Sequence, residues 1–259
     1  MRSIFIFIVL AFASLTPVSL RADLDWIRVA AAGYQALQAY SLSDEDVIEY
    51  VKQTVDYMDD SHTVLPPSSP YSKRLNRLVA GLDMVDGVKL NFRVYEIRDE
   101  VNAFACADGS VRVYSSLMDL MTDEELLGVI GHEIGHVGMH HSRKALKKAL
   151  MTDALREAIA SSSGSLGRLA DSGLGYLGQT MLNAKYSRTQ EKEADDYGYG
   201  FLKKRGHDPR GMIKALEKLQ SLEQQSSKMA KYISSMFSSH PDIEERIARL
   251  KQRYDKDRR

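Results

Sequence analysis

Hydrophobic residues recur every three to four positions along most of this 259-residue chain, a spacing typical of helices with one apolar face. Capping residues, prolines and glycines separate these periodic segments from one another. The pattern predicts helices over residues 23–40, 43–58, 72–82, 122–141, 142–160, 187–205, 208–225, 228–239 and 242–253. The chain is therefore expected to be mostly helical.

The hydrophobic period shortens to two in the stretch before the helix expected over 122–141. Leu90 to Ile97 predicts one strand, and Val101–Cys106 with Val111–Tyr114 predicts a hairpin around an Asp-Gly turn. The expected fold class is α+β, mostly helical, with a small β-sheet beside that helix. The free edge of the hairpin could pair with an extended peptide, or the hairpin merely covers the core; the sequence leaves both open.

The first 22 residues differ in composition from the rest of the chain. Arg2 precedes an uncharged apolar run from Ser3 to Leu20, and Ala22 precedes an acidic segment. This is the plan of a secretory signal peptide over residues 1–22, followed by one domain over residues 23–259. An uncleaved anchor is the alternative, because the run is close to spanning length and Leu20 does not suit a cleavage site. Membrane association is expected only through such an uncleaved leader.

The charge balance bears on the possible partners of the chain, and the cysteine content bears on disulfide formation. The chain carries 35 acidic and 35 basic side chains, so its balance gives no reason to expect a nucleic-acid partner. Cys106 is the only cysteine, so no disulfide can form within the chain. We expect it to be a small buried apolar residue.

The helix expected over 122–141 begins with a capping box of Thr122 and Glu125 and carries the motif H-E-x-x-H. His132 and His136 are four residues apart, so they lie roughly 5–6 Å apart on one face of a helix. Two such imidazoles can bind one zinc ion at about 2.0–2.1 Å per bond. Glu133 points elsewhere and is suited to act as a base toward a metal-bound water. The alternative is a chance match on a surface helix.

The residues that follow the motif exclude one class of zinc protease. Metzincins need glycine and histidine three and six residues after the second histidine, and those positions hold Met139 and Ser142. His140 and His141 are therefore not expected to be metal ligands.

Four glycines form a stripe beside the two histidines: Gly128, Gly131, Gly135 and Gly138. Each costs about 0.8–1.0 kcal/mol relative to alanine inside a helix. A helix that keeps four of them must bring its backbone close to another element. We expect a second ligand-bearing helix to pack into this stripe.

The helix expected over 187–205 has the composition of that second helix. Glu191 and Asp195 are four residues apart and share a face. One carboxylate would complete a His₂Glu site with an open position, and a further carboxylate can orient a ligand histidine. The alternative is a solvated charged face, expected for Lys192 and left open for Glu193.

Three ordered segments together resemble one known family. HEIGH at 132–136, EKEAD at 191–195 and SHPDIEER at 239–246 are similar to motifs of peptidase family M48, the gluzincin-type zinc endopeptidases, and the resemblance spans roughly residues 30–255. It implies a gluzincin-like catalytic domain with one Zn²⁺ per chain. The implied zinc ligands are His132, His136 and Glu191, with Glu133 as general base and Asp195 behind a ligand histidine.

The resemblance also implies roles for two residues of the last segment. His240 is expected to lie near the zinc, and Arg246 is expected to face the cleft. Both could stabilise the tetrahedral intermediate of peptide hydrolysis, or His240 could cap the metal in a resting state. The sequence leaves these alternatives open.

The function implied by the family is zinc-dependent cleavage of misfolded or damaged envelope proteins in the bacterial cell envelope. Envelope relatives often carry a lipid-attachment cysteine and membrane-bound relatives carry several spanning helices, and neither feature is found in this sequence. A periplasmic location is therefore expected, with unfolded envelope polypeptides as substrates. A periplasmic chaperone or assembly factor with a latent zinc site is the alternative.

Overall fold

The structure is a computed structural model, and it describes residues 43–148, 173–183 and 185–259. All of these residues belong to one compact unit, Leu42–Leu150 with Leu169–Arg259. The expected signal peptide, the helix expected over 23–40 and residues 149–160 of a further expected helix lie outside the described residues. The proposed boundary after residue 22 therefore stays a prediction.

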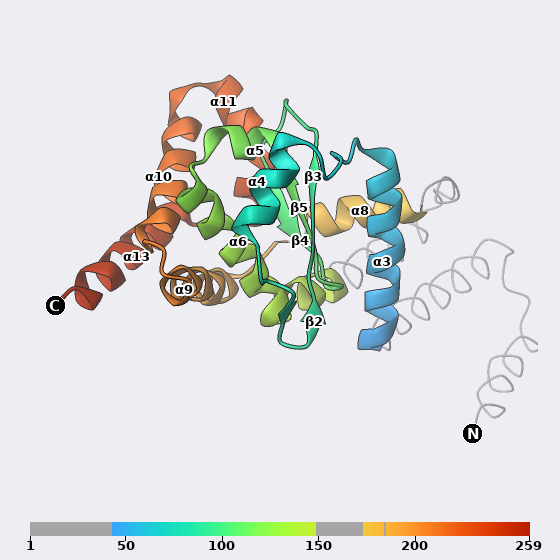
Figure 1. Cartoon of the computed structure of the whole chain (residues 1–259), viewed down its shortest axis with the longest axis horizontal. Coiled ribbons are helices and arrows are strands. Elements are labelled where there is room, and N and C mark those ends of the chain that lie inside the picture. Colours follow the sequence, from blue (N-terminus) through green and yellow to red (C-terminus); the bar gives the residue numbers. More distant parts are fainter. Residues whose placement is uncertain (1–42, 149–172, 184) are drawn as a thin grey trace, which may run out of the picture. The chain divides into compact units, whose positions relative to one another are not determined.

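A three-stranded sheet lies beside the helices (Figure 1). It consists of β3 (Asn91–Tyr95), β4 (Ala103–Ala105) and β5 (Ser110–Tyr114) in the order β3-β5-β4. The expected hairpin is confirmed, because β4 pairs antiparallel with β5. β3 instead pairs parallel with β5, a relationship that the alternating pattern did not specify.

A separate two-stranded ribbon was not expected from the sequence. β1 (Met84–Val85) pairs with β2 (Val88–Lys89) around Asp86 and Gly87. Both turn residues have positive φ, 44° and 77°, as a tight hairpin turn of this kind requires.

Helices make up most of the described chain, which confirms the α+β, mostly helical class. Before residue 139 they are α3 (Asp44–Ser61), α4 (Pro70–Leu78), α5 (Ser115–Leu120) and α6 (Asp123–Gly138), and residues 141–148 are also helical. In the C-terminal half they are α8 (Gly173–Leu182), α9 (Arg188–Lys204), α10 (Arg210–Gln225), α11 (Ser227–Tyr232), α12 (Ser234–Ser239) and α13 (Ile243–Asp257).

Several helices differ from the sequence expectation in their limits; α6, for example, ends at Gly138 rather than His141. α4 ends at Leu78 rather than Leu82, and the chain reaches Gly81 with a φ of 76°, which a helix does not allow. The segment 228–239 is divided into α11 and α12 at Ile233, whose side chain is fully buried. The apolar stripe there is core, but the helix is not continuous.

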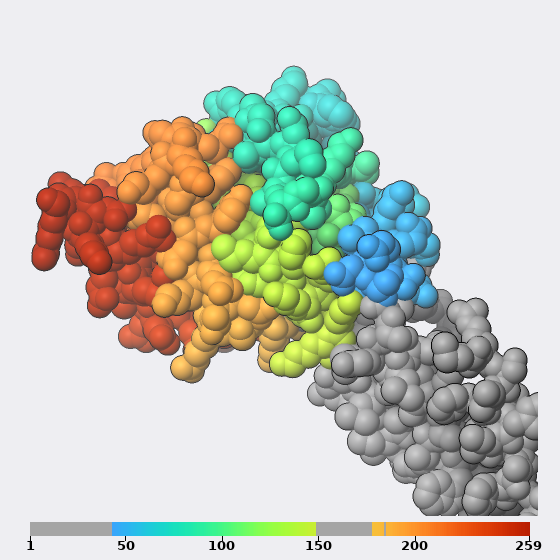
Figure 2. All heavy atoms as spheres, turned by 90° about the horizontal axis from the view of Figure 1, so that it is seen from below, coloured from blue at the N-terminus to red at the C-terminus, as the bar shows by residue number. Residues whose placement is uncertain are grey.

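Helix α6 is the central element of the fold. Thr122 and Glu125 form the expected capping box at its start. Its side chains are buried from Glu125 to Val137, on every face, as expected for a helix enclosed by other elements. It packs against α9, α10 and β4, and Figure 2 shows α9 beside the segment that includes α6 on one face of the molecule.

The glycine stripe explains how close these contacts are. A Cβ added at Gly135 would lie 3.2 Å from the Ala194 Cα, and one at Gly131 would lie 3.2 Å from the Gly198 Cα, so α9 packs directly on this part of α6. The expectation that a second helix packs on the stripe is therefore confirmed for the two central glycines, Gly131 and Gly135. The two ends meet other elements, α10 at Gly128 and β1 at Gly138.

The main core joins the sheet to α6, α9, α10 and α13. Cys106 is buried in a smaller apolar cluster with residues of α3, as expected. Within the described ranges, no helix combines the length and the apolar character needed to cross a membrane.

Candidate metal centre

Four buried side chains bring possible metal-binding atoms together at the centre of the molecule. His132 and His136 lie one turn apart on α6, with their Nε2 atoms 3.0 Å apart. Glu191 of α9 places Oε1 3.4 Å from His136 Nε2 and Oε2 3.6 Å from His132 Nε2. The Nδ1 atom of His240 lies 3.0 Å from Glu191 Oε1. One ligand atom from each of the four lies within 4.8 Å of the others.

The starts and ends of helices fix the positions of Glu191 and His240. Ser187 and Gln190 form a capping box that starts α9 directly before Glu191, so this carboxylate comes from the first turn of a well-defined helix. His240 follows the last residue of α12 and its backbone N–H donates to the Met236 carbonyl. Asp242, with a φ of 62°, then turns the chain into α13. The histidine is thus held between two helices.

Asp195 and Arg246 lie behind the candidate metal-binding groups. The Asp195 Oδ1 atom is 3.0 Å from His132 Nδ1, the ring nitrogen that faces away from Glu191. Arg246 donates from Nε and Nη2 to the two oxygens of Asp195, at 3.0 and 2.7 Å, and its Nη1 pairs with Glu191. Such a forked contact fixes the orientation of both groups.

Charge at this centre is arranged so that both carboxylates stay ionised. Burial alone would raise the pKa of Asp195, but the Arg246 guanidinium and the His132 ring outweigh it and hold this pKa below its ordinary value. Burial likewise opposes ionisation of Glu191, and His240, His136 and Arg246 more than offset it, so its pKa is also lowered. Burial lowers the pKa of His136, which favours its neutral, metal-binding form.

Glu133 differs from the other two carboxylates. Its side chain is 2% exposed, and its Oε1 atom has no hydrogen-bond partner among the described residues. The nearest ring nitrogen of His240, Nε2, is 3.5 Å away from this oxygen. Burial raises the pKa of the Glu133 carboxyl. A buried polar atom without a partner is rare, and one beside a cluster of metal-binding atoms is free to take up a proton from a bound molecule.

The sequence interpretation missed three residues that support His136. The Nδ1 atoms of His136 and His141 lie 3.1 Å apart, and Nε2 of His141 is 3.0 Å from Glu193 Oε2. The ring of Tyr186 stacks on His136 with 3.7 Å between centroids. The sequence pattern excludes His141 only as a metal ligand, and it leaves open whether Glu193 lies on a solvated face.

The other histidines do not join the cluster. His140 has a φ of 58° and its ring pairs with Asp86 at the surface, away from the four candidate atoms. His62 bonds the Met58 carbonyl at the end of α3, and His207 pairs with Glu124. The candidate ligand group among the described residues contains neither His140 nor His141, and their exclusion as ligands stays a prediction.

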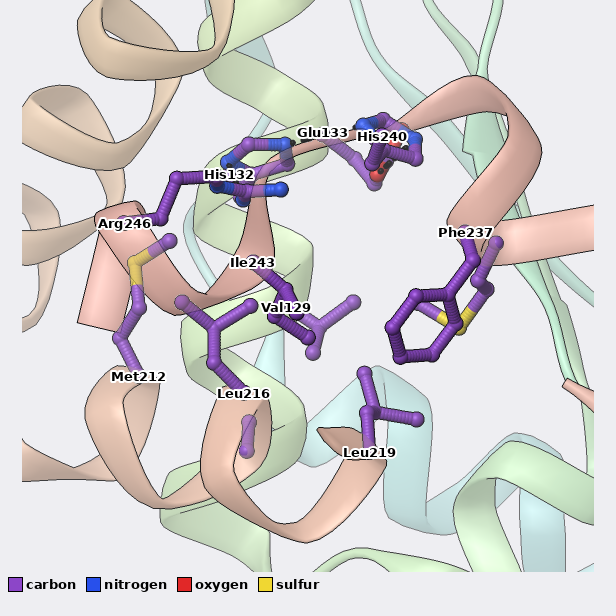
Figure 3. Close-up of a pocket in the computed structure, with 12 residues that line it drawn as sticks. Val129, His132, Glu133, Met212, Leu216, Leu219, Phe237, His240, Ile243 and Arg246 are labelled. Atoms are coloured by element: carbon purple, nitrogen blue, oxygen red, sulfur yellow. Dashed lines mark hydrogen bonds and ion pairs between the residues drawn. The ribbon is translucent and has the colours of Figure 1, made fainter. Parts of the chain in front are cut away.

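Two cavities meet at this centre and share Glu133 and His240. One is lined mainly by apolar side chains of α6, α10 and α12, and Figure 3 shows Val129, Leu216, Leu219 and Phe237 around it. The other runs along the edge strand β4 and is lined partly by polar groups, including Asn102 and Tyr186. The candidate metal centre therefore borders both cavities.

The donor set fits a divalent transition metal. Imidazole nitrogens and one carboxylate are the ligands that zinc uses in its catalytic sites, and all four side chains are buried. Without a cation, four such groups in contact and an unpartnered Glu133 oxygen would be costly to bury.

Comparison with known proteins identifies the family. The model of peptidase family M48 matches residues 72–254. The chain is 43% identical to Metalloprotease LoiP of Escherichia coli (strain K12), over 91% of each chain. It is 41% identical to Metalloprotease YcaL of the same organism, over 86% of this chain and 85% of the relative.

A more distant relative shares only part of its length. The Beta-barrel assembly-enhancing protease of Escherichia coli (strain K12) is 31% identical over 65% of this chain and 35% of the relative. The matched residues 72–254 contain the H-E-x-x-H helix, the carboxylates of α9, and His240. The resemblance noted in the sequence is thereby confirmed: this chain belongs to peptidase family M48 and is a metalloendopeptidase.

Proposed function

We propose that this protein is a zinc-dependent endopeptidase of the bacterial cell envelope that cleaves misfolded or damaged envelope polypeptides. The observation that carries the proposal is the convergence of His132, His136 and Glu191 beside a buried Glu133 oxygen without a hydrogen-bond partner. Metal-binding atoms and a free base within one buried centre are the two parts that metal-assisted hydrolysis requires.

In this proposal His132, His136 and Glu191 hold one zinc ion, and Asp195 orients the His132 ring through its Nδ1–H. Arg246 acts mainly as a positioning residue, because its guanidinium is engaged by Asp195 and Glu191. Bound zinc would supply a water with a pKa lowered toward about 7 and polarise the peptide carbonyl.

Glu133 moves the protons of the reaction. Its Oε1 atom takes a proton from the attacking water and delivers it to the amine nitrogen that leaves. The raised pKa makes the Glu133 carboxylate a stronger base and moves it toward the operating pH, where a general acid–base group is most effective. His240, whose Nε2 is 3.5 Å from Glu133, has two alternative roles: it restrains the reaction when its Nδ1 lies among the candidate ligand atoms, as it does here, and it could donate to the oxyanion once displaced from them.

The edge of β4 supports a polypeptide substrate. β4 pairs with β5 on one side only among the described strands, and it lines the cavity that reaches Glu133 and His240. We propose that an extended segment of the substrate pairs with this edge, which brings one of its peptide bonds to Glu133. Extended chain is exposed in unfolded proteins, so the same edge favours misfolded substrates.

The envelope location rests on the apolar run in residues 1–22 and on the relatives. One relative is named for enhancing the assembly of β-barrels. We propose export by the leader and a periplasmic location, with the membrane-anchored form as the alternative if the leader stays uncleaved.

The decisive experiment combines metal analysis with proteolysis. Purified protein should contain one zinc per chain and digest casein, a chelator should stop digestion, and added zinc should restore it. Glu133→Gln should keep the zinc and lose nearly all hydrolysis, whereas His136→Ala should lose both. Full turnover in Glu133→Gln, or zinc-independent digestion, would refute the proposed mechanism.

His240 favours a second candidate function. Its Nδ1 atom lies 3.3 Å from His132 Nε2, within the group of candidate ligand atoms, where it could occupy the position that a catalytic water needs. In that case the protein is a periplasmic chaperone or assembly factor with a latent zinc site. Binding of unfolded protein without cleavage by the zinc-loaded wild type would support this candidate.

A further inference from the structure

The free edge of β4 is formed by the backbone groups of two alanines. The Asn102 carbonyl accepts a hydrogen bond from an N–H of β5, and the Cys106 N–H donates to a carbonyl beside β5. The direction of these groups alternates along an antiparallel strand, so Ala103 and Ala105 turn their N–H and C=O groups away from β5. These are the groups with which an extended chain could pair.

One of these four groups already has a partner. The Ser142 hydroxyl donates to the Ala105 carbonyl at 2.9 Å. Ser142 is buried, and both residues line the cavity that runs along β4 to Glu133. The hydroxyl therefore lies at the outer edge of β4, on the side where a pairing strand would lie. Among the described residues, this leaves the Ala105 N–H and both groups of Ala103 for such a strand.

Tyr186 holds this serine hydroxyl in place. The phenolic oxygen of Tyr186 lies 3.3 Å from the Ser142 Oγ. Ser142 has one hydroxyl proton and uses it for the Ala105 carbonyl, which can only accept, so Tyr186 is the donor in this contact. The Tyr186 ring stacks on His136 with 3.7 Å between centroids. The position of the Ser142 hydroxyl is thus linked to the candidate metal centre.

The turn at the end of α6 places Ser142 at the sheet. His140, with a φ of 58°, separates α6 from the helical residues 141–148, and Ser142 belongs to the first turn of that segment. The preceding residue, His141, contacts His136. One turn of the chain therefore provides both a support for a candidate ligand and a group that bonds the edge of β4.

We propose that Ser142 is a specificity-determining residue that ends the pairing of a polypeptide substrate at Ala105, with Tyr186 as its positioning residue. A strand on this edge would need the Ala103 and Ala105 carbonyls for two of its N–H groups, two residues apart whichever way it runs. Ser142 occupies the Ala105 carbonyl on that side, so the substrate donates only to Ala103. The inference rests on the proposed peptidase function and adds to it a defined length of pairing.

The first test removes the N–H groups of a substrate one at a time. A casein-derived peptide bound by the zinc-loaded full chain is prepared with each uncleaved amide replaced in turn by an ester, which lacks the N–H. The ester at the residue that faces the Ala103 carbonyl should lower kcat/KM about 2–10-fold, as expected for one hydrogen bond. The ester two residues away, facing Ala105, should have no effect. Equal losses at both positions, or no loss at any position, would overturn the proposal.

Variants of the two hydroxyl groups should change the pattern at one position only. Ser142→Ala frees the Ala105 carbonyl, so the ester that faces it should now also lose about 2–10-fold. Ser142→Thr keeps the hydroxyl and should retain the wild-type pattern. Tyr186→Phe keeps the ring on His136 but removes the donor, so it should show a smaller loss at the same position. An unchanged pattern in both Ser142→Ala and Tyr186→Phe, with normal melting and zinc content, would contradict the proposal.

Ser115 provides a matched control for these variants. It is a fully buried serine whose hydroxyl donates to the Ile97 carbonyl, also at 2.9 Å, and it lies outside the cavity along β4. Ser115→Ala should keep the wild-type pattern of ester effects. A second loss in Ser115→Ala equal to that in Ser142→Ala would show that general loosening of the sheet, and not the freed Ala105 carbonyl, extends the pairing.

A binding measurement separates this inference from the proposed function. Glu133→Gln loaded with zinc should bind the ester series with a single loss, and Ser142→Ala in that background should add the second loss. This pattern in binding, without hydrolysis by the wild type, would refute the peptidase function but keep the role of Ser142. Hydrolysis by the wild type with both losses already present in both measurements would refute the role of Ser142 alone.

Discussion

The Nδ1 atom of His141 lies 3.1 Å from the Nδ1 atom of His136, so one imidazole supports another. If His136 offers Nε2 to a metal, its Nδ1 carries the proton and donates it to His141. The opposite nitrogen of His141 then donates to the Glu193 carboxylate, 3.0 Å away. This chain of contacts fixes the tautomer and orientation of His136, as Asp195 does for His132.

Removing this support should weaken metal binding. His141→Ala is expected to lower zinc affinity by about 10–100-fold, the usual effect of losing a group that orients a ligand. Glu193→Gln should have a smaller effect, because the Glu193 side chain is 49% exposed and water can replace it. Competition with a chromophoric chelator measures both.

The adjacent His140 provides a matched control. His140→Asn keeps a residue that tolerates the positive φ of this position and changes a ring that pairs with Asp86 at the surface. It should bind zinc like the wild type. Unchanged affinity in His141→Ala, in a protein that melts normally, would contradict the orienting role of His141.

His240 should restrain hydrolysis in the arrangement described. Its Nδ1 lies 3.0 Å from Glu191 Oε1, inside the group of candidate ligand atoms, so it competes with water for the fourth position. His240→Ala is expected to raise the initial rate of casein digestion several-fold and to weaken zinc binding. A large fall in kcat with zinc retained would instead assign His240 to stabilisation of the oxyanion.

Close packing of α9 on α6 should make Gly135 intolerant of a side chain. Alanine gains about 0.8–1.0 kcal/mol of helix propensity, but its Cβ would lie 3.0 Å from the Tyr197 Cβ and 3.2 Å from the Ala194 Cα. Overpacking of this kind costs about 1–3 kcal/mol, so Gly135→Ala should reduce the free energy of unfolding and, by shifting α9, zinc affinity.

Gly200, also in α9, is the control for this prediction. A Cβ added there meets nothing within 4 Å, so Gly200→Ala should stabilise the protein by about 0.4–1 kcal/mol. Chemical denaturation of the metal-free proteins measures both changes. Stabilisation by both substitutions would show that the two helices are not in close contact at Gly135.

An ion pair far from the metal centre predicts a pH dependence of stability. The Arg112 side chain is 2% exposed and donates from Nε and Nη2 to the two oxygens of Asp59, at 2.8 and 2.9 Å. Burial alone would raise the pKa of Asp59, but hydrogen bonds from Arg112 and Tyr95 outweigh it, so this pKa is lowered.

Asp59 therefore stabilises the fold fully above the unfolded pKa of about 3.9, and this contribution is lost as pH falls through the lower folded pKa. Asp59→Asn should cost about 3 kcal/mol at pH 7, because it leaves Arg112 buried without its charge partner. The loss should shrink below about pH 4, which unfolding curves over a pH series will show. Glu96→Gln, at an exposed pair with Arg98, should change stability by less than about 1 kcal/mol at any pH.

Local features of this protein follow directly from its sequence. The capping boxes at Ser43 and Thr122 start α3 and α6 where the residue pattern places them. The four-residue spacing of His132 and His136 brings both rings to one face of a helix without help from the rest of the chain. These features depend on contacts within one or two turns, which the order of residues determines.

The sequence also indicated that α6 needs a close neighbour, but not which contacts each glycine makes. The stripe predicted a second helix, and α9 meets it at Gly131 and Gly135. That Gly128 meets α10 and Gly138 meets β1 depends on how distant segments pack. The alternating pattern likewise does not determine that β3 pairs parallel with β5, because this pairing also depends on how distant segments pack.

By itself, then, the sequence determined the helical segments, the hairpin, the H-E-x-x-H pair and, through its resemblance, the family. Only the tertiary structure decided that His141 supports His136, that Arg246 is engaged by Asp195, and that an apolar cavity adjoins Glu133. The first group depends on spacing along a regular helix or strand. The second depends on turns such as the positive φ of His140 and on contacts between residues far apart in the chain, which no local pattern encodes.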